Sequence, residues 1–588
     1  MRLLKSRGSL GSGASRLPPV ASSLPPNASR LPPAGARLGA AAAILAAAGF
    51  LLARLAPDVH GKPLFEDEAV SGLIGARPPW EILVTTLWDR GGAPLHFLLV
   101  HVAFSFDSSA SALRWLSVVF ALATVGLCYD LGRRLEGRVA GVATAVVAAC
   151  SGMLAVYGSF GRMYALLAFA AALAADLFVR ALDLRTPRAA AAAAAAAWLL
   201  PAVHPYGGIV VAIEAVVALA LWRGRPLRAA IPVAVIGLAM LPFAVADLRL
   251  ANRFEVSSAS SRRLATRDEA WNQFTDAVRG FAGGTGWTFA VFLVLAVAGA
   301  LLLARRRPAF VMWGLAALVL PPLLSSLVHT GRAPDLSPRH LIFALPFWAA
   351  FIGTAVARAP ARMVVLVAVA VIAGISPQGI HDPRSITYTA TLGTEEALAA
   401  PSAWLRERIQ ANEVLYPYSS VFLAALPEAG RATALPRAQT GPILDALDRL
   451  DYPVARIFVA IPTGRTRLSS AALEEYLVAR FRSWVLVEVR GEFSDPASVL
   501  AATEKALVAA RDGLQPPVPE PLAGWFGLNV DVLCKSLREL GSECVRATSS
   551  RSFPPTIAAS SETARSRLAR TTSPRFPTAG PVWKTACR

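Results

Sequence analysis

The chain has 588 residues, of which 55% are hydrophobic and 16% are charged, whereas soluble globular domains carry about 25% charged residues. Apolar runs of about 16–22 residues recur through the first two thirds of the chain, and each is long enough to cross the hydrocarbon core of a bilayer. The formal net charge is +19, but the arginines lie in short loops between these runs, where they encode topology. Composition and charge therefore exclude a wholly soluble protein, argue against nucleic acid as a partner, and predict a polytopic membrane protein.

Residues 1–37 form a basic, low-complexity segment in which Leu-Pro-Pro recurs at Leu17, Leu24 and Leu31. Consecutive prolines block a helix, so this segment is predicted to be a disordered cytoplasmic tail. A basic start followed by an apolar run could suggest a signal peptide. This segment is too long for one, and no small-residue cleavage site precedes the charged loop after the apolar run.

The hydropathy pattern predicts about eleven transmembrane helices. They are expected near residues 38–54, 109–131, 139–157, 163–182, 189–204, 207–222, 229–246, 286–304, 309–328, 341–357 and 363–376. The apolar stretch Ala93–Phe106 is short for a span and is predicted to lie as a helix at the membrane interface.

The distribution of arginine predicts the orientation. If Ala93–Phe106 does not cross, the basic tail and the arginine-rich loops all fall on one side, which the positive-inside rule makes cytoplasmic. These arginines are Arg133, Arg134, Arg138, Arg185, Arg188, Arg223, Arg225, Arg228, Arg305, Arg306, Arg307, Arg358 and Arg362. The loops 55–108, 247–285 and 329–340, and everything after about 377, are then expected on the outer side of the plasma membrane.

After residue 377 the pattern changes to alternating strands and helices, which favours a small α/β domain over 377–547. Helices are expected near 394–411, 469–482 and 496–511, and strands at Val414–Tyr418, Arg456–Ile461 and Trp484–Val489. Cys534 and Cys544 either form a disulfide there or remain two thiols. Residues 548–588, rich in Ser, Thr, Arg and Pro, are predicted to be disordered. The expected fold class is thus an all-α polytopic membrane protein, with its membrane domain at 38–376, followed by an extracytoplasmic α/β domain.

Consecutive carboxylates stand in the first outer loop, in the segment Phe65-Glu66-Asp67-Glu68-Ala69-Val70-Ser71. Adjacent carboxylates repel one another unless a cation compensates them, and one of them could serve as a general base. The plainer interpretation is a solvated acidic loop.

Four cationic or titratable residues are expected at the same face of the membrane: Arg114, Arg162, His204 and Arg339. Each arginine alone could be an interface anchor, and a lone histidine is more often a structural hydrogen-bonding group. Together, guanidinium groups beside carboxylates suit the recognition of a phosphate. Within the spans, Asp176 and Arg180 are spaced to pair on one helix, and Glu214 has no evident partner.

The ordered set of segments over about 38–376 resembles the GT-C superfamily of membrane glycosyltransferases, in the branch of the protein O-mannosyltransferases and the lipid A aminoarabinose transferase. Phe65–Ser71 is similar to that branch's Asp-Glu-Ala-x-Ser signature, and Ala93-Pro94-Leu95-His96 begins a segment similar to its interfacial helix. The remaining motifs are Arg114, Arg133-Arg134, Gly161-Arg162-Met163-Tyr164-Ala165-Leu166-Leu167, His204-Pro205-Tyr206-Gly207 and Pro338-Arg339-His340-Leu341.

This resemblance implies transfer of a sugar, with inversion, from a polyprenyl-phosphate donor to a lipid, glycan or protein acceptor at the outer face. It implies that Asp67 is the base, that Glu68 orients the acceptor or binds a metal, and that Asp89 is a second acid. Arg162 and Arg339 would hold the leaving phosphate, with Arg114 and His204 in support. A divalent metal is compatible with the family, but ligand spacing does not indicate one.

The chain departs from the family pattern at three places. Gly92-Ala93-Pro94 stands where the family often has His-Pro-Pro, Ser159-Phe160-Gly161 where it often has Gln-Glu-Ala, and His340 where it usually has Tyr. Two other functions stay open: a lipid-linked saccharide flippase, which would carry more polar residues through the bundle midplane, and a catalytically silent envelope-binding protein.

Overall fold

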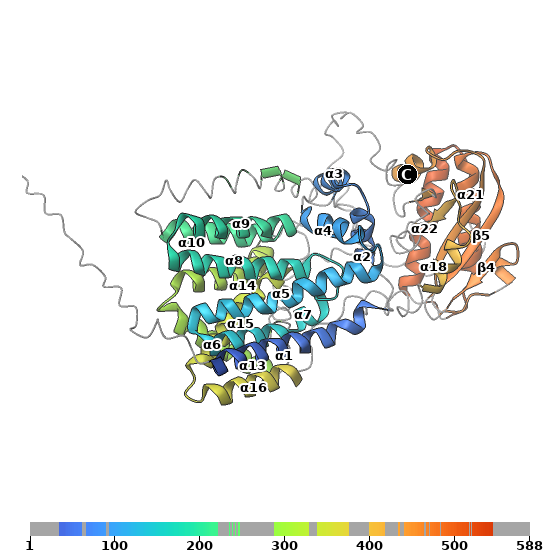
Figure 1. Cartoon of the computed structure of the whole chain (residues 1–588). Helices are drawn as coiled ribbons and strands as arrows, with labels where there is room; N and C mark the ends of the chain where they lie inside the picture. The colour runs from blue at the N-terminus through green and yellow to red at the C-terminus, as the bar shows by residue number, and fades with distance from the viewer. Residues whose placement is uncertain are drawn as a thin grey trace, which may run out of the picture.

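The computed structural model describes two groups of secondary structure, a helical bundle and a smaller α/β domain (Figure 1). The described residues are 34–60, 66–89, 93–221, 287–327, 338–375, 399–417, 433–435, 440–463, 466–469, 471–481, 484–516 and 520–544, with 235, 238, 241–242, 245–246, 281 and 518. Most of the expected span at 229–246, of the loops 247–285 and 329–340 and of the tail 1–37, together with all of the tail 548–588, lies outside this part of the chain.

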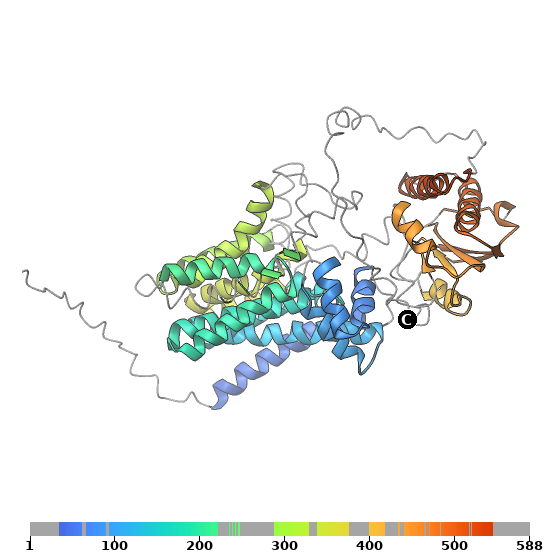
Figure 2. The ribbon, with the colours of Figure 1, turned by 90° about the horizontal axis from the view of Figure 1, so that it is seen from above.

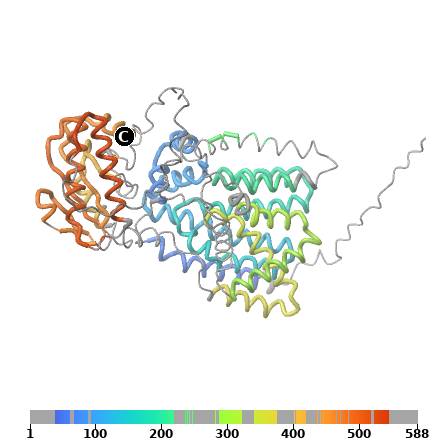
Figure 3. Tube along the Cα trace, turned by 180° about the vertical axis from the view of Figure 1, so that it is seen from behind, coloured from blue at the N-terminus to red at the C-terminus, as the bar shows by residue number. Residues whose placement is uncertain are grey.

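Apolar helices of different lengths lie side by side in the bundle (Figures 1 and 3). They are α1 (Ala34–Val59), α5 (Ala110–Glu136), α6 (Arg138–Ala149), α8 (Tyr164–Leu184), α9 (Pro187–Val203), α10 (Gly207–Leu221), α13 (Trp287–Ala304), α14 (Pro308–Leu327), α15 (Leu345–Arg358) and α16 (Arg362–Ile375). Among the described residues, 5 helical stretches are long and apolar enough to cross a membrane by length and composition. The predicted fold class, a polytopic helical membrane protein with a small sheet, is confirmed.

Small residues allow the central helices to approach closely. Helix α6 packs against both α5 and α15, with Gly132 of α5 and Gly353 of α15 facing the Thr144 side chain. A Cβ atom at either glycine would overlap that side chain, so the contacts depend on the absence of one. The expected span at 139–157 is interrupted: α6 ends at Ala149, Ser151 caps the next helix, and α7 covers Gly152–Tyr157.

Ion pairs join several helices at one end of the bundle. Glu136 of α5 accepts from Arg358 Nε at 2.9 Å and lies 3.8 Å from Arg306. Asp176 accepts from Arg134 Nε at 2.8 Å, so the predicted pairing of Asp176 with Arg180 on its own helix was wrong. Spacing along one helix could not show that α5 brings Arg134 closer.

Three short helices lie at the opposite end of the bundle: α2 (Glu66–Gly75), α3 (Pro79–Asp89) and α4 (Leu95–Phe104) (Figure 1). Ile74, Ile82 and Phe97 form a small core between them. The helix expected over Ala93–Phe106 is therefore present as α4, but the acidic segment belongs to a helix and is not a solvated loop. From Arg114 to Glu136 along α5 the distance is about 33 Å, close to the hydrocarbon thickness of a bilayer.

The C-terminal domain contains a five-stranded mixed sheet in the order β2-β1-β3-β5-β4. The strands are β1 (Val414–Tyr416), β2 (Thr433–Ala434), β3 (Val454–Pro462), β4 (Leu477–Arg480) and β5 (Trp484–Phe493), and the helices are α18 (Ala399–Arg406), α20 (Thr440–Leu447), α21 (Pro496–Asp512) and α22 (Glu520–Glu539). The helix expected over 469–482 was wrong: that segment forms the 3-10 turn η5 (Ala471–Leu473) and the edge strand β4, paired antiparallel with β5. Figure 2 shows this domain beside the end of the bundle that carries α2–α4.

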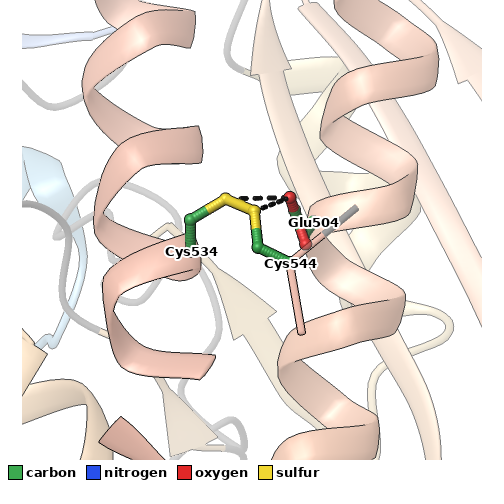
Figure 4. Close-up of side chains that lie close together, drawn as sticks. All are labelled: Glu504, Cys534 and Cys544. Carbon is green, nitrogen blue, oxygen red and sulfur yellow. Dashed lines mark hydrogen bonds between the residues drawn. A yellow bond between two sulfur atoms is a disulfide. The ribbon is translucent and has the colours of Figure 1, made fainter. Parts of the chain in front are cut away.

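A disulfide joins Cys534 of α22 to Cys544 beyond its end, which answers the question that the sequence left open. Figure 4 shows Glu504 of α21 against both sulfur atoms, with its Oε1 at 3.0 Å from Cys534 Sγ and 2.8 Å from Cys544 Sγ. The bridge and α21 together fix the last helix against the domain core.

Candidate functional site

Glu68 and Arg114 form a fully buried ion pair that ties α2 to α5. Arg114 donates from Nε to Glu68 Oε1 at 3.0 Å and from Nη2 to Glu68 Oε2 at 2.8 Å, and neither side chain is exposed. Two parallel hydrogen bonds of this kind suit a guanidinium and a carboxylate, and they offset the cost of removing both charges from water. Glu68 and Arg114 are therefore satisfied by each other.

The same carboxylate also holds the turn that precedes α8. The Gly161 N–H donates to Glu68 Oε1 at 2.7 Å, and Ser117 of α5 donates to the Phe160 carbonyl at 2.7 Å. A Cβ atom at Gly161 would lie 2.6 Å from Leu113 Cγ, so this close approach explains why glycine stands where the family pattern often has alanine. The buried pair thereby fixes the backbone on either side of Gly161.

Arg162 follows that turn and reaches back to α2. Its Nη1 donates to the Ser71 hydroxyl at 3.2 Å and to the Asp67 carbonyl at 3.4 Å. Ser71 in turn donates to the same carbonyl at 3.2 Å. The guanidinium of Arg162 therefore lies beside the start of α2, one residue from the buried Glu68.

Asp67 points away from the buried pair and towards Arg339. Its Oδ2 lies 3.7 Å from Arg339 Nη1, and the two side chains are 35% and 27% exposed. Successive residues of a helix point about 100° apart, which is why Asp67 reaches the surface while Glu68 is buried. Arg339 comes from the 3-10 turn η2 (Pro338–Ala344), which precedes α15, so residues far apart in the sequence meet here.

Four rings pack together next to these charged groups. The His204 ring stacks on Tyr206 at 5.2 Å between centroids and lies 5.2 Å from His340, while Tyr206 lies 4.9 Å from His340. Tyr164 lies 6.2 Å from both histidine rings, and the Arg339 guanidinium lies 5.8 Å from the Tyr164 centroid. We call Tyr164, His204, Tyr206 and His340 the ring cluster. Neither Tyr164 nor the packing of Tyr206 was predicted, because aromatic residues at helix ends are common in membrane proteins.

Burial keeps His204 neutral. Its imidazole is removed from water and lies near the positive Arg162 and Arg339, and the two effects, burial first, lower its pKa to about 3. Its Nδ1 accepts from the Tyr206 N–H at 3.2 Å, so the neutral ring holds the turn that carries Tyr206.

Of the residues expected in the site, the structure brings Asp67, Glu68, Arg114, Arg162, His204 and Arg339 to one end of the bundle. Asp89 is the last residue of α3, and its side chain is outside the described part of the structure. Among the described residues, one group of three side chains could share a metal ion, Glu504, Cys534 and Cys544, and its cysteines are already joined. The described side chains beside Asp67 therefore do not make up a metal-ligand set.

Apolar helices in a bundle, with short helices and a charged cluster at one end, define a polytopic membrane protein. The chain shares its fold with ArnT, in agreement with the resemblance to the GT-C superfamily that the sequence predicted. The crystal structure of ArnT from Cupriavidus metallidurans in the apo state matches with a TM-score of 0.53 at 15% identity, over 77% of this chain and 98% of ArnT. ArnT bound to undecaprenyl phosphate matches with a TM-score of 0.51 at 14% identity, over 79% of this chain and 99% of ArnT.

The likeness lies in the fold, since sequence identity is low. No protein-family model and no curated protein matches the sequence.

Proposed function

We propose that this protein transfers a sugar from a polyprenyl-phosphate carrier to an acceptor at the outer face of the membrane. The observation that carries the proposal is the meeting of Asp67, Arg162 and Arg339 at one end of the bundle, with Asp67 and Arg339 partly exposed and 3.7 Å apart. A lipid-borne phosphosugar needs this combination: cations for the phosphate, a base for the acceptor, and a place where both can be reached from the bilayer.

The two arginines suit the donor phosphate. Arg162 and Arg339 approach α2 from two elements, the turn before α8 and η2, so a phosphate between them would receive hydrogen bonds from two directions. The match of this fold to ArnT bound to undecaprenyl phosphate supports a donor of this class.

Asp67 is the proposed base. The acceptor hydroxyl gives its proton to the Asp67 carboxylate while the hydroxyl oxygen forms a bond to the anomeric carbon of the sugar. The bond from that carbon to the phosphate oxygen breaks, and the electron pair leaves with the polyprenyl phosphate. Attack from the face opposite the phosphate inverts the anomeric carbon, and Arg162 and Arg339 stabilise the charge that develops on the leaving group.

The remaining residues have positioning roles in this proposal. Glu68 and Arg114 bind each other, so their effect on substrate is indirect: they hold α2 and the Gly161 turn in register. His204 supports Tyr206 as a neutral ring instead of contributing charge to the phosphate site. Asp89 stays a candidate for a second acid, because α3 ends at the same end of the bundle.

The proposed topology follows the arginine pattern. The arginine-rich end, with Glu136, Arg306 and Arg358, would be cytoplasmic, and the end with Asp67 would face outward together with residues 377–547. A reporter fused after Ile375 should then be outside, and one fused at Arg306 inside.

The decisive experiment replaces Asp67 by Asn. The purified variant should transfer sugar at least about 100-fold more slowly than the wild type, because the amide cannot accept the proton. Glu81→Gln, an acidic residue on neighbouring α3, is the matched control and should keep wild-type activity. Full transfer by Asp67→Asn at normal expression would remove Asp67 as the base.

A further inference from the structure

The disulfide between Cys534 and Cys544 lies against a fully buried carboxylate (Figure 4). Glu504 is 0% exposed, and its Oε1 lies 3.0 Å from Cys534 Sγ and 2.8 Å from Cys544 Sγ. The sulfur atoms of a disulfide carry no proton, but once the bond is reduced each thiol has a proton to donate to this oxygen. The three side chains are thus placed for proton transfer between a thiol and a carboxylate.

The two sulfur atoms differ in their access to solvent. Cys534 is 6% exposed and belongs to the domain core, whereas Cys544 is partly exposed beyond the end of α22. Thiol–disulfide exchange begins when a thiolate attacks a sulfur atom that it can reach. An external thiol therefore reaches Cys544 first, and Cys534 is the sulfur that leaves.

The fold keeps the two sulfur atoms close when the bond is open. Gly541 ends α22 with a positive φ of 76°, and the Ser542 N–H donates to the Leu537 carbonyl at 2.9 Å, so the chain turns back at this point. Leu537 is fully buried in the core that also contains Leu507 of α21, and this packing holds α22 in place without the bridge. Opening of the bond is therefore local, and the cysteines stay in position to close it again.

We propose that Cys534, Cys544 and Glu504 form a thiol–disulfide exchange site whose substrate is an external thiol. In the reducing direction the external thiolate bonds to Cys544 Sγ and the S–S bond breaks. Cys534 Sγ leaves with the electron pair and takes the proton of the Glu504 carboxyl group. A second thiol of the reductant then releases Cys544, so the reductant is oxidised to a disulfide.

The oxidising direction reverses these steps. Cys544 first forms a mixed disulfide with an external disulfide and releases one external thiol. Glu504 takes the proton of Cys534, and the Cys534 sulfur attacks Cys544 Sγ and expels the second external thiolate. This site is separate from the proposed transferase site and does not depend on it.

The negative charge of Glu504 has an opposite effect on the same step. A carboxylate that exchanges no proton disfavours a thiolate beside it and so slows the attack. The Glu504→Gln substitution distinguishes the two effects, because loss of a base slows closure of the bond and loss of a repelling charge accelerates it.

The test follows closure of the bond in the full-length protein in detergent, with a metal chelator present. Cys587 is replaced by Ser in every sample so that its thiol does not compete. Millimolar dithiothreitol should reduce the bond in the folded protein, and glutathione disulfide should restore it. Acid quenching, alkylation and mass spectrometry count the free thiols at each time.

Glu504→Gln should close the bond at least about tenfold more slowly than its parent at pH 7. Its rate should rise about tenfold for each pH unit up to pH 8.5, because only the free thiolate then attacks, and the parent's rate should rise less. Glu475→Gln is the control, since this exposed carboxylate of the same domain pairs with Lys505, and it should close as the parent does. Closure by Glu504→Gln as fast as in the parent, or faster, would overturn the role of Glu504.

Single-cysteine variants test the order of attack without changing Glu504. Cys544 in Cys534→Ser should react with glutathione disulfide at least about tenfold faster than Cys534 does in Cys544→Ser. If the two cysteines react equally fast, or if the folded protein resists dithiothreitol, the bridge is a structural crosslink and the exchange site is refuted. These outcomes decide the proposal even if Glu504→Gln does not fold.

Discussion

Glu68 Oε2 lies 2.8 Å from Arg114 Nη2 in a contact from which both side chains exclude water completely. The pair spans 46 residues of sequence and joins α2, which carries Asp67, to α5, against which the Gly161 turn packs. Since Arg162 follows that turn, the distance between the proposed base and one of the proposed phosphate ligands depends on a pair that need not touch substrate.

Replacing Glu68 by Gln should destabilise the protein strongly. The substitution removes the carboxylate charge that lies 2.8 Å from the buried Arg114 guanidinium, and breaking a buried ion pair typically costs about 3–5 kcal/mol. The apparent melting temperature in detergent should fall sharply, and transfer should fall with it. Glu407→Gln is the control, because Glu407 pairs with Arg408 at 3.1 Å but is 72% exposed, and an exposed pair contributes little. Equal melting temperatures for the two variants would contradict the structural role of the buried pair.

The double variant Glu68→Leu with Arg114→Met separates charge from shape. It removes both charges and keeps the volume, so it should recover part of the stability that Glu68→Gln loses. Recovery of stability without recovery of transfer is expected, because the Gly161 N–H loses its acceptor.

The sequence predicted most of the helices and the residue types of the site, because spans and arginine loops are encoded locally. It did not show that Glu68 is buried and Asp67 partly exposed, because that difference arises only once Glu66–Gly75 is a helix and one face meets α5. The pairing of Asp176 with Arg134 of α5 was not predicted for the same reason, since helix packing brings these two residues together. The segment Leu477–Arg480 was expected to be helical from its local pattern. It is an edge strand because it pairs with β5, and this tertiary contact is not contained in the local pattern.

Arg162→Ala should raise the apparent KM for a polyprenyl-phosphate donor and lower kcat/KM about 10- to 100-fold, since one cation of the phosphate site is lost. Arg162 also donates to the Ser71 hydroxyl, so a change in α2 could produce a similar loss. Ser71→Ala removes that hydrogen bond and keeps the charge, and its KM should change by no more than about twofold. Kinetics over a range of donor concentrations distinguish the two variants. An unchanged KM in Arg162→Ala would take this residue out of the phosphate site.

Gly161→Ala tests the close approach at the turn. The added methyl group would lie 2.6 and 2.8 Å from two atoms of the Leu113 side chain and 3.2 Å from Glu68 Oε1. Overpacking of this kind costs about 1–3 kcal/mol and would displace the backbone that carries Arg162. Gly208→Ala on α10 is the control, because nothing lies within 4 Å of a Cβ atom there. The melting temperature and the donor KM should change for Gly161→Ala alone, and equal effects would show that the turn tolerates a side chain.

Acid should destabilise the protein through His204. The folded protein lowers the pKa of His204 to about 3, whereas an unfolded chain has a histidine pKa of about 6.5. Above pH 6.5 both states are neutral at this residue and no penalty arises. As the pH falls from 6.5 towards 3 only the unfolded state takes up the proton, so folding stability is lost at about 1.4 kcal/mol per pH unit, or about 2 kcal/mol at pH 5.

The measurement compares the melting temperature of the wild type and His204→Asn between pH 7.5 and pH 5. Asparagine keeps an acceptor for the Tyr206 N–H but does not titrate, so the variant should lose less of its melting temperature on acidification than the wild type does. Because the folded imidazole stays neutral throughout this range, transfer by the folded wild type should show no step that His204→Asn abolishes. A pH dependence of melting that is identical in both proteins would mean that His204 is accessible to protons in the folded state, and would remove it from the buried layer behind Tyr206.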